Sequence, residues 1–132
     1  MGKKQNKKNV IQKLIALLKK RIKQKKKLRP KSEFRYNHDT GHMNYVFLGN
    51  DDSFRSVGLT SHDTTFGRRN MPLHNNPKKG DKKPYYVRNG IVSDSKRSYS
   101  KKTAKNYKFS NADKANVKSK IRHYKKEQKK RK

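Results

Sequence analysis

The sequence predicts a small, mainly β domain, an antiparallel barrel or sandwich, with one helix before it and another after it. Short β-prone segments separated by Gly, Asn and Pro occupy the middle of the chain. Apolar residues recur at helical spacing near both ends. Basic residues crowd into the two end segments, so the middle keeps a near-ordinary charge balance and is the part best able to fold.

The first helix is predicted within a basic N-terminal arm, residues 1–33. Its apolar residues recur at spacings of three and four, which is typical of an amphipathic helix: Val10, Ile11, Leu14, Ile15, Leu18 and Ile22. Pro30 follows and is incompatible with a helix interior. Two interpretations of the apolar stripe stay open. It packs against the domain or a partner, or it lies on an anionic membrane surface.

The first two strands are predicted to form a hairpin. Residues 45–48 are β-prone and run into the turn-forming residues 49–52, after which residues 54–60 alternate between two faces. A weaker third strand is predicted over residues 69–73. It contains Pro72, which lacks a backbone N–H, so we expect it at an edge of the sheet.

A further turn is predicted at Asn89-Gly90, a dipeptide suited to a type I′ turn. The flanking segments, residues 85–88 and 91–92, are rich in aromatic and β-branched residues and are predicted strands. Residues 93–105 are polar, rich in Ser and Lys, and are predicted to be an extended loop.

The second helix is predicted to begin after Ser110, whose hydroxyl can cap the first backbone amides, with Asp113 as the capping-box partner. Its apolar face consists of Ala112, Val117, Ile121 and Tyr124. The β-domain with this closing helix therefore spans residues 34–124. The charged run over residues 125–132 is predicted to be a disordered basic tail.

The charge balance points to a polyanionic partner. The chain has 39 Lys and Arg against 9 Asp and Glu, a net charge of +30. Residues 1–30 hold 13 basic residues and no acid, and residues 101–132 hold 14 basic residues and 2 acids. Lys and Arg bind phosphates without reading sequence, so nucleic acid is the expected partner, RNA in preference to DNA.

Aromatic residues stand beside basic ones at several places in the chain, as in proteins that stack single-stranded bases next to phosphate-binding cations. Most of the rings in so small a domain are nevertheless expected in the core. The candidate nucleic-acid-binding residues are Arg35, Arg68, Arg69, Lys82, Lys83, Arg88 and Lys108.

Length and composition exclude several classes of protein. A chain of 132 residues is too short for a multidomain enzyme with a deep cofactor crevice. The absence of Cys excludes disulfides, thiolate zinc sites and iron–sulfur clusters. The His spacing matches no zinc motif and no phosphate-cradling glycine motif occurs, so we predict neither metal nor cofactor. Without an apolar run of membrane-spanning length, we predict a cytoplasmic protein with no integral membrane association.

Histidine is the residue type that could make this protein an enzyme. A ribonuclease needs no metal if one group takes the proton of the 2′-OH and another protonates the leaving oxygen. Imidazole suits both tasks because its pKa lies near neutrality. His42 and His62 are expected at strand or loop ends, where functional sites collect. For each, a surface histidine without a role is the alternative interpretation.

Residues 54–124 resemble the PemK/MazF-like toxins of bacterial toxin–antitoxin systems. The resemblance rests on the segments Val57-Gly58-Leu59-Thr60-Ser61, Met71-Pro72-Leu73 and Pro84-Tyr85-Tyr86-Val87-Arg88 with Ile91-Val92, followed by the helix from Ser110 to Tyr124. It implies an SH3-like barrel that cleaves single-stranded RNA without metal, an antitoxin protein as partner, and a homodimer. By this resemblance Thr60 and Ser61 match the family's Thr-Ser active-site element. His42 stands where the family carries an Arg-Pro pair.

Two classes of function follow. The first is an RNA-binding protein that is a metal-independent endoribonuclease. His42 and His62 would then move protons, and Thr60 and Ser61 would position the scissile phosphate, with arginines neutralising its charge. The second class is non-catalytic: a DNA- or RNA-binding accessory protein of a mobile element or phage, or a ribosome-associated RNA-binding protein.

Overall fold

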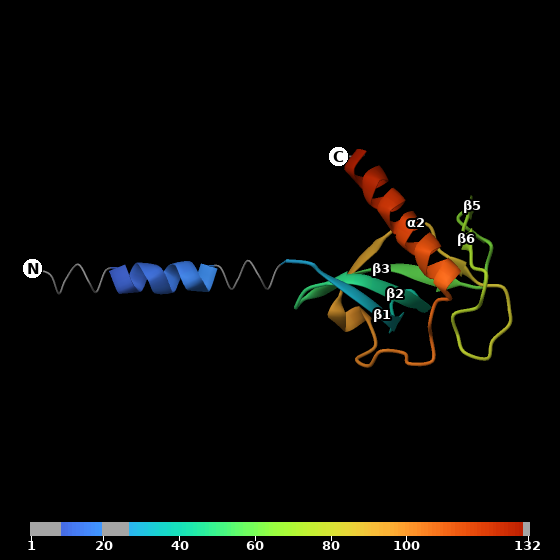
Figure 1. Ribbon diagram of the computed structural model, residues 1–132, viewed down its shortest axis with the longest axis horizontal. Helices are drawn as coiled ribbons and strands as arrows, with labels where there is room; N and C mark the ends of the chain where they lie inside the picture. The colour runs from blue at the N-terminus through green and yellow to red at the C-terminus, as the bar shows by residue number, and fades with distance from the viewer. Residues whose placement is uncertain (1–8, 20–26, 131–132) are drawn as a thin grey trace, which may run out of the picture.

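The fold is an open antiparallel sheet with the C-terminal helix packed across it (Figure 1). The computed structural model describes residues 9–19, which are helical, and residues 27–130. The elements of the second part are β1 (Arg29–Asn37), β2 (His42–Gly49), β3 (Ser53–Thr60), β4 (Thr64–Thr65), β5 (Arg68–Arg69), β6 (Met71–Pro72), β7 (Tyr86–Val87), β8 (Val92–Ser95), the 3₁₀ turn η1 (Lys96–Ser98) and α2 (Asn111–Lys130).

The main sheet has six strands. Its order is β1-β2-β3-β7-β6, and β8 pairs with β3 as well. β4 and β5 form a separate two-stranded sheet. The prediction of a mainly β domain with a helix at each end is confirmed. Within the described residues β1 and β6 lie at the two ends of the strand order, so the sheet does not close into a barrel.

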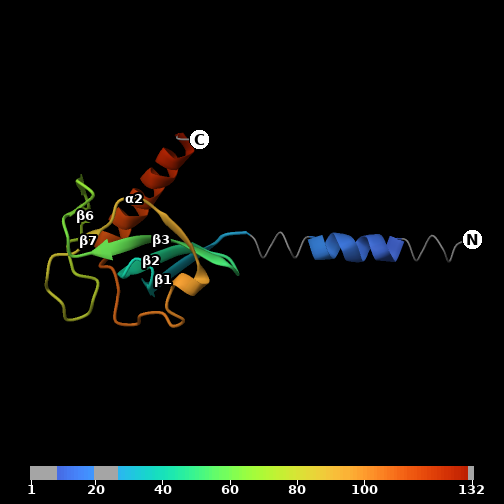
Figure 2. The ribbon, with the colours of Figure 1, turned by 180° about the vertical axis from the view of Figure 1, so that it is seen from behind.

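β3 is the central strand and is hydrogen-bonded along both edges. β2 pairs with one edge, which confirms the predicted first hairpin. The other edge is shared, because β8 pairs with residues 53–56 and β7 with Leu59 and Thr60 (Figure 2). The strands on either side of Asn89-Gly90 therefore pair with β3 in succession rather than with each other. The turn at Asn89-Gly90 moves the chain along one edge of β3 instead of closing a hairpin.

The main core lies between this sheet and α2. The helix contributes Val117, Ile121 and Tyr124, all buried as the predicted apolar face requires, while Ala112 is exposed. The remaining buried residues of this core are Phe34, Tyr45, Phe47, Val57, Leu59, Val87 and Phe109. Each buried side chain of this size contributes about 1.5–3 kcal/mol.

A second, smaller cluster consists of Val46, Phe54 and Tyr99. Val46 alternates with Tyr45 and Phe47 along β2, so it points to the opposite face of the sheet. Three cations surround the ring of Phe54: Lys31 Nζ at 5.6 Å, Arg35 Cζ at 5.1 Å and Lys96 Nζ at 5.1 Å from its centroid. The chain has few carboxylates to neutralise these cations, and the ring of Phe54 stabilises them instead through cation–π interactions.

β1 was not predicted as a strand, and it crosses the predicted boundary between arm and domain at residue 33. Its sequence is polar, and it forms a strand because it pairs with β2 over most of its length. Its other edge is covered by the polar segment predicted as a loop. There Ser100 N–H donates to Tyr36 O at 2.8 Å and Ala104 N–H to Phe34 O at 2.7 Å. This cover protects an edge strand from pairing with another chain.

The weak strand predicted over residues 69–73 is split into two. β5 turns back on β4, and β6 continues to the edge of the main sheet, where Pro72 lies as predicted. Asn70 separates the two and is buried, with 4% of its surface exposed.

α2 begins as predicted, with Asp113 N–H donating to Ser110 Oγ at 3.3 Å. The carboxylate of Asp113 does not complete a capping box. It is fully buried and accepts hydrogen bonds from His74 N–H at 2.8 Å and Asn75 N–H at 3.0 Å. It therefore ties the loop after β6 to the helix. The helix continues to Lys130, through most of the segment that was predicted to be a disordered tail.

The predicted N-terminal helix is present over residues 9–19, and Ile22 lies outside the described residues. Its large aliphatic side chains are about half exposed: Val10, Ile11, Leu14, Ile15, Leu17 and Leu18. Within the described residues no helix is both long and apolar enough to cross a bilayer. Both interpretations of the stripe, a protein contact and an anionic membrane surface, stay predictions.

Replacing Asp113 by Ala should destabilise the domain by about 2–4 kcal/mol, because the backbone N–H groups of His74 and Asn75 lose a buried, charged acceptor. Urea unfolding followed by circular dichroism measures this. The control is Asp63→Ala, which removes one exposed carboxylate and the same unit of charge. Equal effects of the two substitutions would show that charge, rather than the buried hydrogen bonds, governs the stability.

Candidate nucleic-acid interface

One end of the central strand brings predicted site residues together. β3 ends at Thr60, and His42 begins β2. The antiparallel register pairs Asn44 with Gly58, so His42 lies beside the last residues of β3. On the other edge of β3, Arg88 follows β7, and its N–H donates to Gly58 O at 2.8 Å. With His62, which follows β3, the residues His42, Thr60 and Arg88 form what we call the strand-end cluster.

The neighbours of His42 in this cluster affect its pKa. Burial lowers the pKa of His42 below its usual value of 6.5, and the positive charge of Arg88 lowers it further. His62 also lowers this pKa, whereas a hydrogen bond with the backbone of Leu59 acts in the opposite direction. His42 is therefore mainly neutral at pH 7 and able to accept a proton.

Gly58 makes room for Arg88. A Cβ atom on Gly58 would lie 2.9 Å from Cδ of Arg88, closer than unstrained carbon atoms approach, and at an ordinary contact distance of 3.5 Å from its Cγ. The aliphatic part of the arginine side chain thus rests directly on the backbone of β3. This contact holds the Arg88 side chain against β3, the strand beside which His42 lies.

Thr60 and Ser61 differ in what they offer to a ligand. Thr60 is buried, and its Oγ1 accepts the N–H of His62 at 3.2 Å, so it shapes the turn that carries His62. Ser61 is exposed. Of the two hydroxyls proposed to position a phosphate, that of Ser61 is the more accessible to solvent.

Arg68 and Arg69 belong to a short protruding element, residues 64–69, which we call the basic hairpin. β4 and β5 pair as Thr64 with Arg69 and Thr65 with Arg68, and Phe66-Gly67 form the turn. Both arginines are exposed. Within the described part of the chain, neither guanidinium takes part in an ion pair.

The buried side chain of Asn70 anchors the basic hairpin. Its Nδ2 donates to His62 O at 3.0 Å and to Thr65 Oγ1 at 2.8 Å. Its Oδ1 accepts the N–H of Asn89 at 3.3 Å. One amide therefore joins the hairpin, the segment carrying His62 and the turn after β7, which fixes their relative positions.

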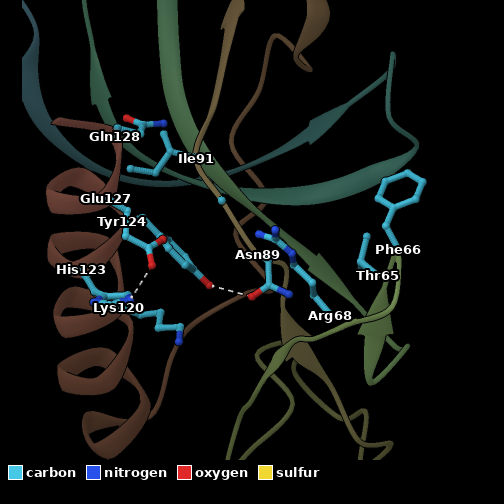
Figure 3. Close-up of a pocket in the computed structure, with 11 residues that line it drawn as sticks. Thr65, Phe66, Arg68, Asn89, Ile91, Lys120, His123, Tyr124, Glu127 and Gln128 are labelled. Carbon is cyan, nitrogen blue, oxygen red and sulfur yellow. Dashed lines mark hydrogen bonds and ion pairs between the residues drawn. The ribbon is translucent and has the colours of Figure 1, made fainter. Parts of the chain in front are cut away.

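A pocket of about 560 Å³ lies between the basic hairpin and α2 (Figure 3). The Tyr124 hydroxyl donates to Asn89 Oδ1 at 3.3 Å across it. Arg68 lines one side and Lys120 the other, where the Lys120 ammonium lies 5.4 Å from the centroid of the Tyr124 ring. The pocket also holds the ion pair of His123 with Glu127, at 3.1 Å.

Lys82, Lys83 and Lys108 lie elsewhere, around a second pocket of about 890 Å³ formed by residues 73–85 and 105–108. Six lysines and one carboxylate, that of Asp81, line this lysine pocket, together with Tyr85 and Tyr107. The surplus of positive charge makes it a site for anions.

Arg35 stands apart from these groups. Its Nε donates to Glu33 Oε2 at 2.9 Å, and its Nη1 donates to the carbonyls of Ser100 and Lys101 at 2.9 and 2.8 Å. These bonds fasten the covering segment to β1, so Arg35 has a structural role. Its contact with nucleic acid stays a prediction.

Sequence reasoning missed Asn70, Lys120 and the exposure of Phe66. Asn70 interrupts two short strand segments, and no local pattern marks its three partners. Lys120 is one lysine among many. The combination Phe66-Gly67-Arg68-Arg69 did signal an aromatic ring beside cations, yet core burial was the favoured interpretation for each ring. Phe66 is 97% exposed, whereas Phe34 and Phe109 are buried as expected.

The described residues contain no group of three or more His, Asp or Glu placed to hold a metal ion. Comparisons with models of protein families, with curated proteins and with solved structures give no match to this chain.

Replacing Arg88 by Gln should raise the pKa of His42, because the positive charge that disfavours the imidazolium is removed. An NMR pH titration of the imidazole protons measures the change. Arg122→Gln, which removes an exposed arginine from α2, should leave the His42 titration unchanged. If both substitutions move it equally, the net charge of the protein and not the neighbouring Arg88 controls His42.

Proposed function

We propose that this protein binds nucleic acid, RNA in preference to DNA, through its unneutralised cations. One observation supports the proposal above the others. The chain has 39 Lys and Arg, and of those that the structure describes only Lys31 and Arg35 form an ion pair with a carboxylate, both with Glu33. The positive potential is thus left for an external polyanion, which gains affinity by releasing its counterions.

The lysine pocket and the basic hairpin are the proposed contact surfaces. Both expose several cations over a short distance, and both hold aromatic rings beside them, a combination that favours single strands with accessible bases. The two basic ends of the chain add contacts to phosphates that carry no sequence preference. A cytoplasmic location, where RNA is the abundant polyanion, is part of this proposal.

The strand-end cluster favours a second function, metal-independent cleavage of the bound RNA. Neutral His42 would take the proton of a ribose 2′-OH, and the oxygen would attack the adjacent phosphorus. His62 would give a proton to the leaving 5′-oxygen, and Arg88 would stabilise the charge on the phosphoryl oxygens. The products are a 2′,3′-cyclic phosphate and a free 5′-OH. Ser61 would position the phosphate, and Thr60 would hold the turn of His62.

The resemblance to PemK/MazF-like toxins extends this second function. It adds an SH3-like arrangement of the strands, which here stays open, a homodimer and an antitoxin protein that restrains cleavage. Under this proposal, expression of the protein alone arrests bacterial growth. A non-catalytic nucleic-acid-binding protein of a mobile element, a phage or the ribosome is the alternative when binding occurs without cleavage.

Binding to oligouridine should weaken steeply as KCl is raised, and Lys82→Gln with Lys83→Gln should reduce the slope of log affinity against log salt. For single strands each lost phosphate contact lowers the slope by about 0.7. Fluorescence anisotropy measures both. The control is Lys31→Gln with Lys96→Gln, which removes the same charge from around Phe54.

An affinity insensitive to salt would contradict the binding proposal. An equal change of slope in the control would show that the lysine pocket is not a contact surface. Equal affinity for oligothymidine of the same length would contradict the preference for RNA.

Replacing His42 or His62 by Ala should slow RNA cleavage in EDTA by about 10²–10⁴-fold, since each removes a proton-transfer group. The rate should rise with pH through the lowered pKa of His42, below 6.5, because the base must be neutral. Gel analysis with end-group identification measures the rate and the cyclic phosphate.

His38→Ala removes an exposed imidazole outside the strand-end cluster and should leave the rate unchanged. A 2′-deoxy substitution at the scissile nucleotide should block the reaction. RNA that stays intact with the wild-type protein while binding is retained would exclude the enzyme and favour the non-catalytic alternative.

A further inference from the structure

Phe66 is the most exposed large hydrophobic residue of the described chain, at 97%. It stands in the turn of the basic hairpin, where its ring lies apart from the other side chains around the pocket (Figure 3). At this exposure almost the whole face of the ring is accessible to a ligand.

The backbone makes this position unfavourable for Phe. Phe66 has φ of 51° and Gly67 has φ of 76°, both in the left-handed region. Among the described residues Phe66 is the only one other than glycine with positive φ. Turns with two such residues favour Asn, Asp or Gly. The sequence thus places a bulky ring where a small polar residue would suit the turn better.

The base of the hairpin is held in place. Asn70 Nδ2 bonds both to Thr65 Oγ1 and to His62 O, and Asn89 Nδ2 donates to Arg69 O at 2.7 Å. The ring is therefore presented by an anchored element rather than by a free loop. Less conformational entropy is lost when a ligand contacts a group that is already positioned.

Positive charge flanks the ring. Arg68 and Arg69 follow it in the hairpin, and Lys120 faces Arg68 across the pocket. None of the three forms an ion pair with a described carboxylate. Arg68 and Lys120 line the same pocket as Phe66, and Arg69 extends from the opposite face of β5. Phosphates on the two sides of a nucleotide seated on Phe66 would therefore each meet a cation.

We propose that Phe66 is a stacking platform for an unpaired nucleobase, with Arg68, Arg69 and Lys120 holding the adjoining phosphates. This inference rests on the proposed RNA binding and specifies its substrate as single-stranded. In a duplex the base faces are covered by their neighbours, so only a single strand can offer one to the ring.

The chemistry around the ring favours a base over a protein or a lipid surface. Thr65 and Gly67 are its neighbours in the turn, and the arginines come next, so the basic hairpin supplies no second large apolar side chain beside the ring. A protein partner or a bilayer would use such a patch. A nucleotide needs one ring face and nearby cations, which is what the hairpin provides.

The experiment uses Phe66→Trp, because the chain has no Trp and the introduced indole is the only one. Oligouridine should quench its fluorescence by stacking, whereas duplex RNA should not. Tyr36→Trp, at an exposed aromatic position on β1, is the matched control and should show no quenching. Equal quenching by duplex RNA, or equal quenching in the control, would overturn the proposal.

The affinity measurement uses Phe66→Asn, which removes the ring and suits the positive φ, so the variant should fold at least as stably. Its affinity for oligouridine should fall by roughly fivefold to a hundredfold, with Phe66→Trp retaining wild-type affinity and duplex binding unchanged. If Phe66→Asn binds oligouridine as tightly as the wild type, and the wild type shows salt-dependent binding, the stacking proposal is overturned. The proposed RNA binding would then still hold. A wild-type protein that binds no RNA would overturn the proposed function as well.

Discussion

The structure depends on the hydrogen bonding of β3 along both of its edges. β2 occupies one edge over its length, while β8 and then β7 divide the other, and the division falls near Gly58. Val57 and Leu59, on either side of Gly58, are completely buried in the main core, so a slip of this strand by one residue would move both out of that core and put Gly58 and a polar neighbour in their place. Because its register is so constrained, the ends of three strands meet at one place. His42 and Arg88, which are distant in sequence, become neighbours there.

The buried amide of Asn70 likewise holds together segments that are distant in sequence. It connects the basic hairpin, the segment after β3 and the turn after β7, and Asn89 continues the connection to Tyr124 of α2. Within the described residues no buried side-chain nitrogen or oxygen lacks a hydrogen-bond partner. A satisfied polar network of this kind favours one arrangement over its competitors. The basic hairpin, the segment that carries His62 and the helix are therefore held as one unit.

The sequence predicted those elements that are specified by residues close together in the chain. The hairpin of β2 and β3 followed from β-prone runs around a turn, and the start of α2 followed from Ser110. β1 and residues 93–95 of β8 were not predicted as strands, because their sequences are polar and their stability comes from distant pairing. The role of Asp113 escaped for the same reason, since its partners lie 38 and 39 residues away. His42, His62 and Arg88 were identified by chemistry alone. Their proximity could be predicted only with the register of β3.

The cations around Phe54 show how the domain tolerates its charge. They also indicate how the stability of the fold depends on salt. Lys31, Arg35 and Lys96 face a ring, with Glu33 the only nearby carboxylate in an ion pair. In such a fold the Lys and Arg side chains repel one another, and this repulsion is reduced by added salt or by a bound polyanion. Salt that dissociates the bound polyanion also screens the repulsion between the cations, so it replaces the stabilisation that the polyanion gave. The free protein in dilute buffer is the form nearest to unfolding and the most open to proteases.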